Sequence, residues 1–183
     1  MKYQIIYADP PWWTDGAAVK AQQRRGKERK VIHYDFDHYG QMKIDELKAL
    51  PIKDMAEDNA VLFLWTTDAA IPQAIQLFDA WGFKYKTVGF VWVKTGMTGT
   101  VQHSMRQWTF GNTELCLLGV RGSMIAHRVP GIAQLVVHPR MEHSKKPDSI
   151  RRLIMKMFPE CNRRIELFAR CLIPGWDAWG NDV

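Results

Sequence analysis

The residues best suited to chemistry form one short stretch, Asp9-Pro10-Pro11-Trp12, which directly follows the apolar run at residues 3–8. Such a run of apolar and aromatic residues predicts a buried strand. Each proline fixes its backbone φ angle and has no N–H group to donate. A loop built from a carboxylate, two prolines and an aromatic ring therefore accepts hydrogen bonds but hardly donates them.

A loop of this kind suits an exocyclic amine whose two N–H groups need acceptors while its nitrogen is attacked by an electrophile. The N6 amino group of adenine is such an amine, and it is a poor nucleophile because its lone pair is delocalised into the ring. Hydrogen bonds to the Asp9 carboxylate and the Pro10 carbonyl would favour a more tetrahedral nitrogen and aim its lone pair at a methyl donor. Trp12 would stack on the extruded base. The alternative is a proline-rich turn that only closes a strand.

Composition bounds the possibilities. With 183 residues and 46% hydrophobic content, the chain is long enough for one domain with one core, residues 1–183. It has no run of about twenty apolar residues and no charged-then-apolar leader, which argues against a membrane span and a secretory signal and predicts a cytoplasmic protein. The net charge of +6 and the pI near 9.3 favour a polyanionic partner.

Cysteine and histidine spacing predicts neither a metal site nor a disulfide framework. Cys116, Cys161 and Cys171 are widely separated, and the six histidines are scattered along the chain. Zinc sites and disulfide-rich domains need compact clusters of these residues. We therefore expect a mechanism without a metal.

A long polar stretch at residues 14–40 is crowded with positive charge. Loops of this length in compact domains are usually functional or disordered, so we interpret it as an arm that binds phosphates. The alternative is a solvated charged loop with no partner. Aromatic residues at its far end could stack on bases or anchor the loop to the core. The basic residues are Lys20, Arg24, Arg25, Lys27, Arg29 and Lys30, and the aromatic ones are Tyr34, Phe36 and Tyr39.

Two further loops, near residues 95–113 and 121–133, combine glycines with basic and aromatic side chains. The first contains His103, Arg106 and Trp108, and the second contains His127 and Arg128. Both are candidates for contacting nucleic acid around a target base. They could equally be ordinary surface loops.

Apolar periodicity indicates an α/β fold. The order strand, helix, strand, helix, strand predicts a mostly parallel sheet with helices on both faces, and Gly82 is suitably placed to end the second helix. Ligands of such sheets bind beyond the carboxyl ends of the strands, where Asp9 lies. The expected strands are 3–8, 60–65, 88–93, 115–120, 134–138 and 164–169, with a last strand or turn at 176–181, and the expected helices are 44–50, 71–81 and 150–158.

These segments resemble the MT-A70 family of S-adenosylmethionine-dependent adenine N6 methyltransferases over nearly the whole chain. The resemblance consists of several motifs in the same order, which makes chance agreement implausible. In chain order they are Asp9-Pro10-Pro11-Trp12, Leu62-Phe63-Leu64-Trp65, Trp92-Val93-Lys94-Thr95, Asn112 with Cys116-Leu117-Leu118-Gly119-Val120, Lys146-Pro147-Asp148, Ile165-Glu166-Leu167-Phe168 and Gly180-Asn181.

The resemblance implies a Rossmann-like methyltransferase fold in the permuted, β-type order, in which the catalytic motif precedes the cofactor-binding strand. It implies that Asp9, Pro10, Pro11 and Trp12 are catalytic and that S-adenosylmethionine is the cofactor. Asp9 would accept a bond from N6 and also face the ammonium group of the cofactor, while Lys146 would hold its carboxylate. The residues around its ribose and adenine would be Glu166, Leu167, Phe168, Arg170, Asn181 and Asp182.

On the nucleic-acid side, the family resemblance adds a tyrosine near the reaction centre, which corresponds to Tyr39. The candidate substrate-binding residues are Trp12, Tyr39, Lys94, Asn112, Arg24, Arg25, Lys27 and Arg106. The chain differs from many family members in having Ala169 where glycine is common, and Cys171-Leu172-Ile173 in place of a His-Asn pair near the ribose.

The implied reaction is direct in-line methyl transfer to adenine N6, with no covalent enzyme intermediate. DNA is the favoured substrate, by analogy with bacterial and phage members of the family. Two alternatives stay open: RNA as the substrate, and a nucleic-acid-binding subunit whose cofactor pocket is inactive. The protein is expected to be a monomer or homodimer.

Overall fold

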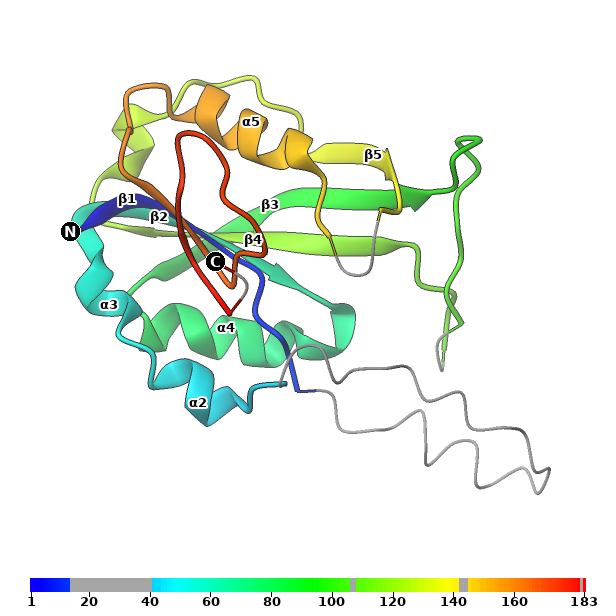
Figure 1. Cartoon of the computed structure of the whole chain (residues 1–183), viewed down its shortest axis with the longest axis horizontal. Coiled ribbons are helices and arrows are strands. Elements are labelled where there is room, and N and C mark those ends of the chain that lie inside the picture. The colour runs from blue at the N-terminus through cyan, green and yellow to red at the C-terminus, as the bar shows by residue number, and fades with distance from the viewer. Residues whose placement is uncertain (14–40, 106–107, 142–144, 182) are drawn as a thin grey trace.

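The protein is seen here as a computed structural model that describes residues 1–13, 41–105, 108–141, 145–181 and 183 (Figure 1). The described residues form a seven-stranded sheet in the order β5-β3-β4-β2-β1-β6-β7. The strands are β1 (Tyr3–Ala8), β2 (Ala56–Thr66), β3 (Lys84–Thr95), β4 (Thr113–Arg121), β5 (Leu135–Pro139), β6 (Arg164–Leu167) and β7 (Asp177–Trp179).

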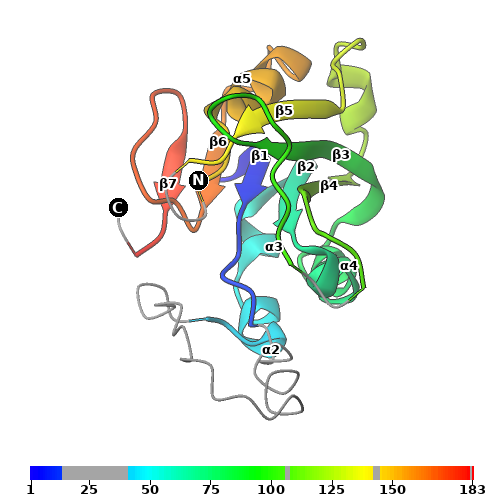
Figure 2. The same ribbon diagram turned by 90° about the vertical axis from the view of Figure 1, so that its right-hand side faces the viewer.

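Helices cover both faces of this sheet (Figures 1 and 2). They are α2 (Ile44–Lys48), α3 (Ile52–Met55), α4 (Ile71–Ala80) and α5 (Asp148–Met157), with the 3₁₀ turns η1 (Asp68–Ala70) and η2 (Met124–His127). Successive side chains of β1 point to opposite faces of the sheet, so they pack into two separate hydrophobic cores, one on each face. Ile6 and Ala8 pack in the cluster that includes α2, α3 and α4, whereas Ile5 and Tyr7 pack in the cluster that includes α5. The predicted Rossmann-like α/β architecture is confirmed.

The sheet is mostly parallel, as predicted, with one reversal. β1 pairs in parallel with β2 and β6, β6 with β7, and β3 with β5. β4 runs antiparallel to both of its neighbours, β2 and β3. The reason is the connection between β3 and β4, for which the structure describes no helix to carry the chain back to the other end of the sheet.

Most predicted elements are present, with shifted ends. The helix predicted at 71–81 spans Ile71–Ala80, and Gly82 follows it with φ +78°, the left-handed conformation of a helix terminus. The bond from the Phe83 N–H to the Phe78 carbonyl completes this cap. The predicted strands at 60–65 and 88–93 are longer, and the short helix α3 was not expected. No helix among the described residues is long and apolar enough to cross a lipid bilayer.

Parallel strands bring their carboxyl ends to one edge of the sheet. Ala8, at the end of β1, pairs with Leu64 on one side and Leu167 on the other. Asp9 therefore lies between the ends of β2 and β6. Because β4 is reversed, its first residues reach the same edge, next to the last residues of β3.

Candidate active site

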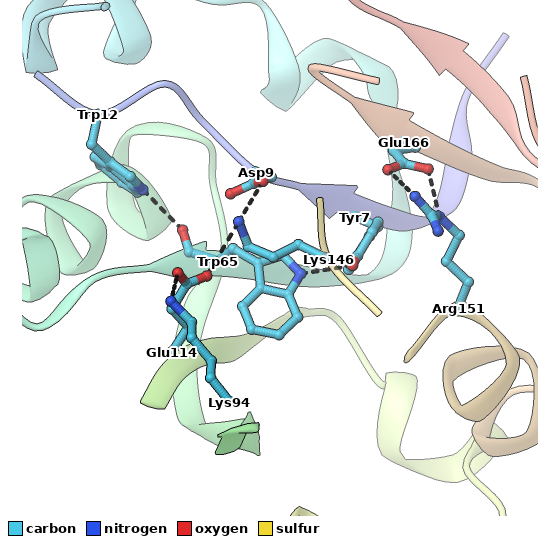
Figure 3. A network of polar contacts seen from close by, with 9 residues as sticks. All are labelled: Tyr7, Asp9, Trp12, Trp65, Lys94, Glu114, Lys146, Arg151 and Glu166. Carbon is cyan, nitrogen blue, oxygen red and sulfur yellow. Dashed lines mark hydrogen bonds and ion pairs between the residues drawn. The ribbon is translucent and has the colours of Figure 1, made fainter. Parts of the chain in front are cut away.

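The carboxylate of Asp9 forms an ion pair with Lys146 at the carboxyl edge of the sheet (Figure 3). Nζ of Lys146 lies 2.6 Å from Oδ2 of Asp9, and the lysine side chain is almost fully buried while that of Asp9 keeps 24% exposure. The two residues come from the end of β1 and from the segment before α5, 137 positions apart. Lys146 also lies over the Trp65 ring, 5.5 Å from its centroid.

Two further charged residues extend this pair into a cluster of four. Oε2 of Glu114, on β4, lies 3.3 Å from Nζ of Lys146, and its other oxygen accepts a hydrogen bond from Lys94 at the end of β3. The cluster thus contains two carboxylates and two ammonium groups, Asp9, Glu114, Lys94 and Lys146. We call it the acid–lysine cluster. Its charges balance, which lowers the cost of burying them together.

Burial and neighbouring charges shift the pKa values of this cluster in different directions. Burial raises the pKa of Asp9 from 3.8, Lys146 opposes this change, and the negative charge of Glu114 adds to it. At Glu114, burial also tends to raise the pKa, but the positive charges of Lys146 and Lys94 outweigh this effect, so the Glu114 pKa is lowered. At Lys146, burial tends to lower the pKa, but the negative charges of Asp9 and Glu114 outweigh this effect. The Lys146 pKa therefore rises, and the ammonium group stays charged.

The loop after Asp9 is held by backbone hydrogen bonds. The Trp12 N–H donates to the Pro10 carbonyl at 2.9 Å, and the Met42 N–H donates to the Pro11 carbonyl at 2.8 Å. The side chain of Trp12 is also fixed, because its Nε1 donates to the carbonyl of Trp65 at 3.0 Å. The Pro10 carbonyl has a second lone pair, so it can still accept a bond from a ligand.

Trp65, the penultimate residue of β2, links several of these groups. Its carbonyl holds Trp12, its ring lies under Lys146, and its Nε1 donates to the Tyr7 hydroxyl at 2.7 Å. The Trp92 ring meets it edge to face at a centroid distance of 6.4 Å. Burial raises the pKa of Tyr7 well above 10, so its hydroxyl stays protonated.

Glu166, on β6, is held by a bidentate ion pair. Nε and Nη2 of Arg151, on α5, each lie 2.7 Å from one of its oxygens, and Nη1 reaches Asp148 at 2.6 Å. The guanidinium also lies 5.6 Å from the centroid of the Tyr7 ring. Arg151 thereby fixes the start of α5, which directly follows the segment that carries Lys146, to the strand β6.

The chain turns sharply where β6 ends. Phe168 has φ +60°, the left-handed region that an aromatic residue rarely adopts, and such conformations cluster at functional sites. Its ring meets that of Trp179 at a centroid distance of 5.4 Å. Gly180 lies so close to this turn that a Cβ there would be 2.3 Å from the Ala169 carbonyl oxygen. Only glycine permits this approach of the two backbones.

The other predicted site residues are placed as follows. Arg170 is near enough to Asp9 for its charge to lower the Asp9 pKa. The Leu167 side chain is fully buried, so only its backbone can meet a ligand. Asn181 is exposed, and the Asn112 carbonyl accepts from the Lys94 N–H at 2.9 Å. The predicted residues that lie outside the described ones are Arg24, Arg25, Lys27, Tyr39, Arg106 and Asp182.

Three residues of this site were not anticipated from the sequence: Glu114, Trp65 as a hydrogen-bonding link, and Arg151. Glu114 has one visible signal, because it is the only acidic residue between Asp79 and Glu142. Arg151 stands on the inward face of α5 beside Ile150 and Ile154, where a charged residue needs a buried partner. Nothing in the local sequence identifies Glu166 as that partner.

No three side chains of the usual metal-ligating types gather within the described part of the chain. The expected mechanism without a metal stays a prediction. The free thiols Cys116 and Cys161 are buried and Cys171 is exposed.

Comparison with known proteins gives a consistent result. The family model MT-A70 matches residues 3–182. The chain is 36% identical to the Type II methyltransferase M.MunI of Mycoplasma sp, over its whole length and 78% of that relative. It is 28% identical to the N(6)-adenosine-methyltransferase catalytic subunit METTL3 of Homo sapiens, again over its whole length but over only 28% of that relative. A fungal relative from Cryphonectria parasitica, named N6-methyladenosine RNA methyltransferase MTA1, is 27% identical and is covered over 52% of its length.

Proposed function

Since the chain belongs to the MT-A70 family of adenine N6 methyltransferases, we propose that it transfers the methyl group of S-adenosylmethionine to adenine N6 in DNA. The observation that carries this proposal is the partly buried Asp9–Lys146 ion pair at the carboxyl edge of the sheet. In this pair, the Asp9 carboxylate can accept a hydrogen bond from adenine N6, and the Lys146 ammonium beside it can bind the carboxylate of S-adenosylmethionine. Both lie where ligands of parallel sheets usually bind.

Asp9 and the Pro10 carbonyl are the acceptors for the two N6–H bonds. One Asp9 oxygen holds Lys146, and a carboxylate offers about four lone-pair sites in total, so acceptor capacity remains for the amine. The rigid Pro10-Pro11 backbone fixes these acceptors before the base arrives, which lowers the barrier through orientation. The raised pKa of Asp9 also makes its carboxylate a better acceptor for the proton that N6 loses.

The residues at the same edge fit the cofactor that the family uses, which supplies an electrophilic methyl group on a sulfonium. Lys146 provides a buried, charged ammonium for its carboxylate, and Arg170 stands near Asp9. The tight packing of Gly180 on the Phe168–Ala169 turn shapes the segment proposed to meet its ribose and adenine. Glu166, Phe168, Asn181 and Asp182 remain the proposed contacts there, with the Leu167 backbone.

Two features support DNA over RNA. Identity and the share of the relative covered are both higher for the Type II methyltransferase than for the relatives named for adenosine or RNA. RNA is the second candidate, because the fungal relative is named an RNA methyltransferase.

We also propose that residues 1–183 act as a single domain, as a cytoplasmic monomer or homodimer, with the loops near 14–40, 95–113 and 121–133 contacting nucleic acid.

A methyl-transfer assay tests the proposal. The protein is incubated with radiolabelled S-adenosylmethionine and with native DNA, heat-denatured DNA or RNA, and the modified base is then mapped. Label on adenine N6 of DNA is the expected result, and label on RNA alone would favour the second candidate. Absence of transfer, together with absence of heat when S-adenosylmethionine is titrated by calorimetry, would identify an inactive subunit instead.

A further inference from the structure

The described residues 96–105 and 108–112 belong to an arm that projects from the sheet between β3 and β4 (Figures 1 and 2). Its base is paired to the strand ends, since the Gln102 N–H donates to the Lys94 carbonyl and the Lys94 N–H donates to the Asn112 carbonyl, both at 2.9 Å. Further out, Ser104 and Gly111 exchange two backbone hydrogen bonds, of 2.7 and 2.9 Å. The described residues beyond this pair, Met105 and residues 108–110, are called the tip of the arm.

Three of the four described side chains of the tip are large, apolar and exposed, and the fourth, Thr109, is exposed and polar. Trp108 and Met105 are each 90% exposed and Phe110 is 65% exposed. Most other tryptophans of the described chain are buried or partly buried, and Trp65, Trp81, Trp92 and Trp176 all lie in the two cores. Apolar side chains gathered at an exposed point usually mark a surface that a partner covers.

The base of the arm is joined to the proposed reaction centre. Lys94 stands at the base and belongs to the acid–lysine cluster, which runs through Glu114 and Lys146 to Asp9. Both ends of the arm therefore lie at the same edge of the sheet as Asp9. A partner that presents an adenine to Asp9 is therefore bound at the sheet edge from which this arm projects.

The lack of acidic residues around the arm favours a negatively charged partner. Residues 94–112 include no acidic residue, and besides Lys94, which is paired with Glu114, the basic residues of that stretch are His103 and Arg106. Arg140 adds a positive charge at the base, where its N–H donates to the Thr95 carbonyl at 2.9 Å. A tip of aromatic and thioether groups on an acid-free support suits a nucleic-acid duplex, which offers stacked bases between phosphates.

We propose that the tip enters a double-stranded substrate and that Trp108 takes the place of the target adenine in the base stack after the base turns out toward Asp9. This inference rests on the proposed function and narrows its substrate to duplex nucleic acid. Extruding a base costs stacking and pairing free energy, and an aromatic ring inserted into the gap recovers part of it. In this arrangement Met105 and Phe110, the other exposed apolar residues of the tip, contact the neighbouring bases.

The test compares Trp108→Ala and Trp108→Phe with the unaltered protein, on a duplex that carries the mapped target and on its single strand. Trp108→Ala should lose about tenfold or more of the rate on the duplex and keep the rate on the single strand, where no stack has to be opened. Trp108→Phe should retain most of the duplex rate. With 2-aminopurine at the target position, the rise in fluorescence on extrusion should be lost in Trp108→Ala.

Leu135→Ala is the matched control, because Leu135 is a large exposed apolar residue of β5 outside the arm. Unchanged duplex methylation in Trp108→Ala overturns the inference, and so does an equal loss on both substrates. A dimer that dissociates in Trp108→Ala, seen by sedimentation, would instead make the tip an interface between two copies of the chain. Quenching of tryptophan fluorescence by duplex, measured without cofactor, should be smaller in Trp108→Phe than in the unaltered protein, and equal quenching in the two would contradict insertion even if no methyl transfer occurs.

Discussion

At the scale of single residues, the proposed chemistry depends on Asp9 and on the three charged residues that surround it. Lys146 neutralises the carboxylate, Glu114 competes for the same ammonium, and Lys94 holds Glu114. The sequence motifs and the family resemblance predicted Asp9 and Lys146 as site residues, and the structure places their side chains in contact. The sequence could not reveal the pairing of Lys94 with Glu114, because that contact depends on the reversed direction of β4 and on its register with β3.

Asp9→Asn should lower the rate of methyl transfer by about a hundredfold or more, since the amide provides a weaker acceptor in the same shape. Titration of S-adenosylmethionine by calorimetry should still show binding, weaker than in the unaltered protein. Single-turnover rates on the mapped DNA target measure the effect. Methyl transfer at the full rate in Asp9→Asn would contradict the role proposed for Asp9.

The pH dependence of the rate should report the raised pKa of Asp9. The ionised carboxylate is the form that accepts N6–H bonds, so the rate should fall as the pH drops through a value above 3.8. Glu114→Gln removes one negative charge and leaves Asp9 as the remaining carboxylate partner of Lys146 in the cluster. Both changes lower the Asp9 pKa, so the acidic limb of the rate profile should move to lower pH. An unmoved limb would mean that another group controls it.

At the scale of elements, the apolar runs of the sequence predicted where the strands lie. They did not predict where each strand begins and ends, because the ends of some strands are polar. β1 matches its expected range because every residue of it is apolar or aromatic except Gln4. β2 begins earlier than expected because Glu57, Asp58 and Asn59 are polar residues at its solvent-facing start. The antiparallel pairing of β4 was not predicted, since periodicity gives no information about strand direction.

Arg151→Met should destabilise the protein, because it leaves the Glu166 carboxylate buried without its bidentate partner. Removing one member of a buried ion pair typically costs about 3–5 kcal/mol. Urea unfolding followed by circular dichroism measures this loss. The double variant Arg151→Met with Glu166→Gln should recover much of the stability, because no uncompensated charge remains. If the single variant is as stable as the unaltered protein, Arg151 does not fix α5 to β6.

At the scale of the whole molecule, the net positive charge favours a polyanionic partner, as the proposed function requires. The net charge of +6 is unevenly distributed along the sequence, with Glu114 the only acid in the long interval from 80 to 141. Glu114 itself is engaged with two lysines. The composition predicted the class of partner, whereas the exposure of the arm's tip could be seen only in the folded chain.

Binding to DNA should weaken steeply with salt, because neutralising phosphates with lysine and arginine side chains releases counterions. Replacing Arg24, Arg25 and Lys27 together by alanine should reduce the slope of log K against log salt by about 0.9 for each phosphate that these side chains neutralise. Fluorescence anisotropy with a labelled duplex at several salt concentrations gives the slope. Calorimetry with S-adenosylmethionine serves as the control and should be unaffected. An unchanged slope would assign phosphate binding to other residues.

The reversal of β4 also bears on how proteins of this kind could diversify. Because the chain leaves the sheet at Thr95 and re-enters it at Thr113 beside its point of departure, the intervening residues form a self-contained insertion. Lengthening or replacing that insertion would leave the alignment of all seven strands untouched. On the role proposed for the arm, target preference could change by exchange of this one segment, without any change to the residues proposed to carry out methyl transfer.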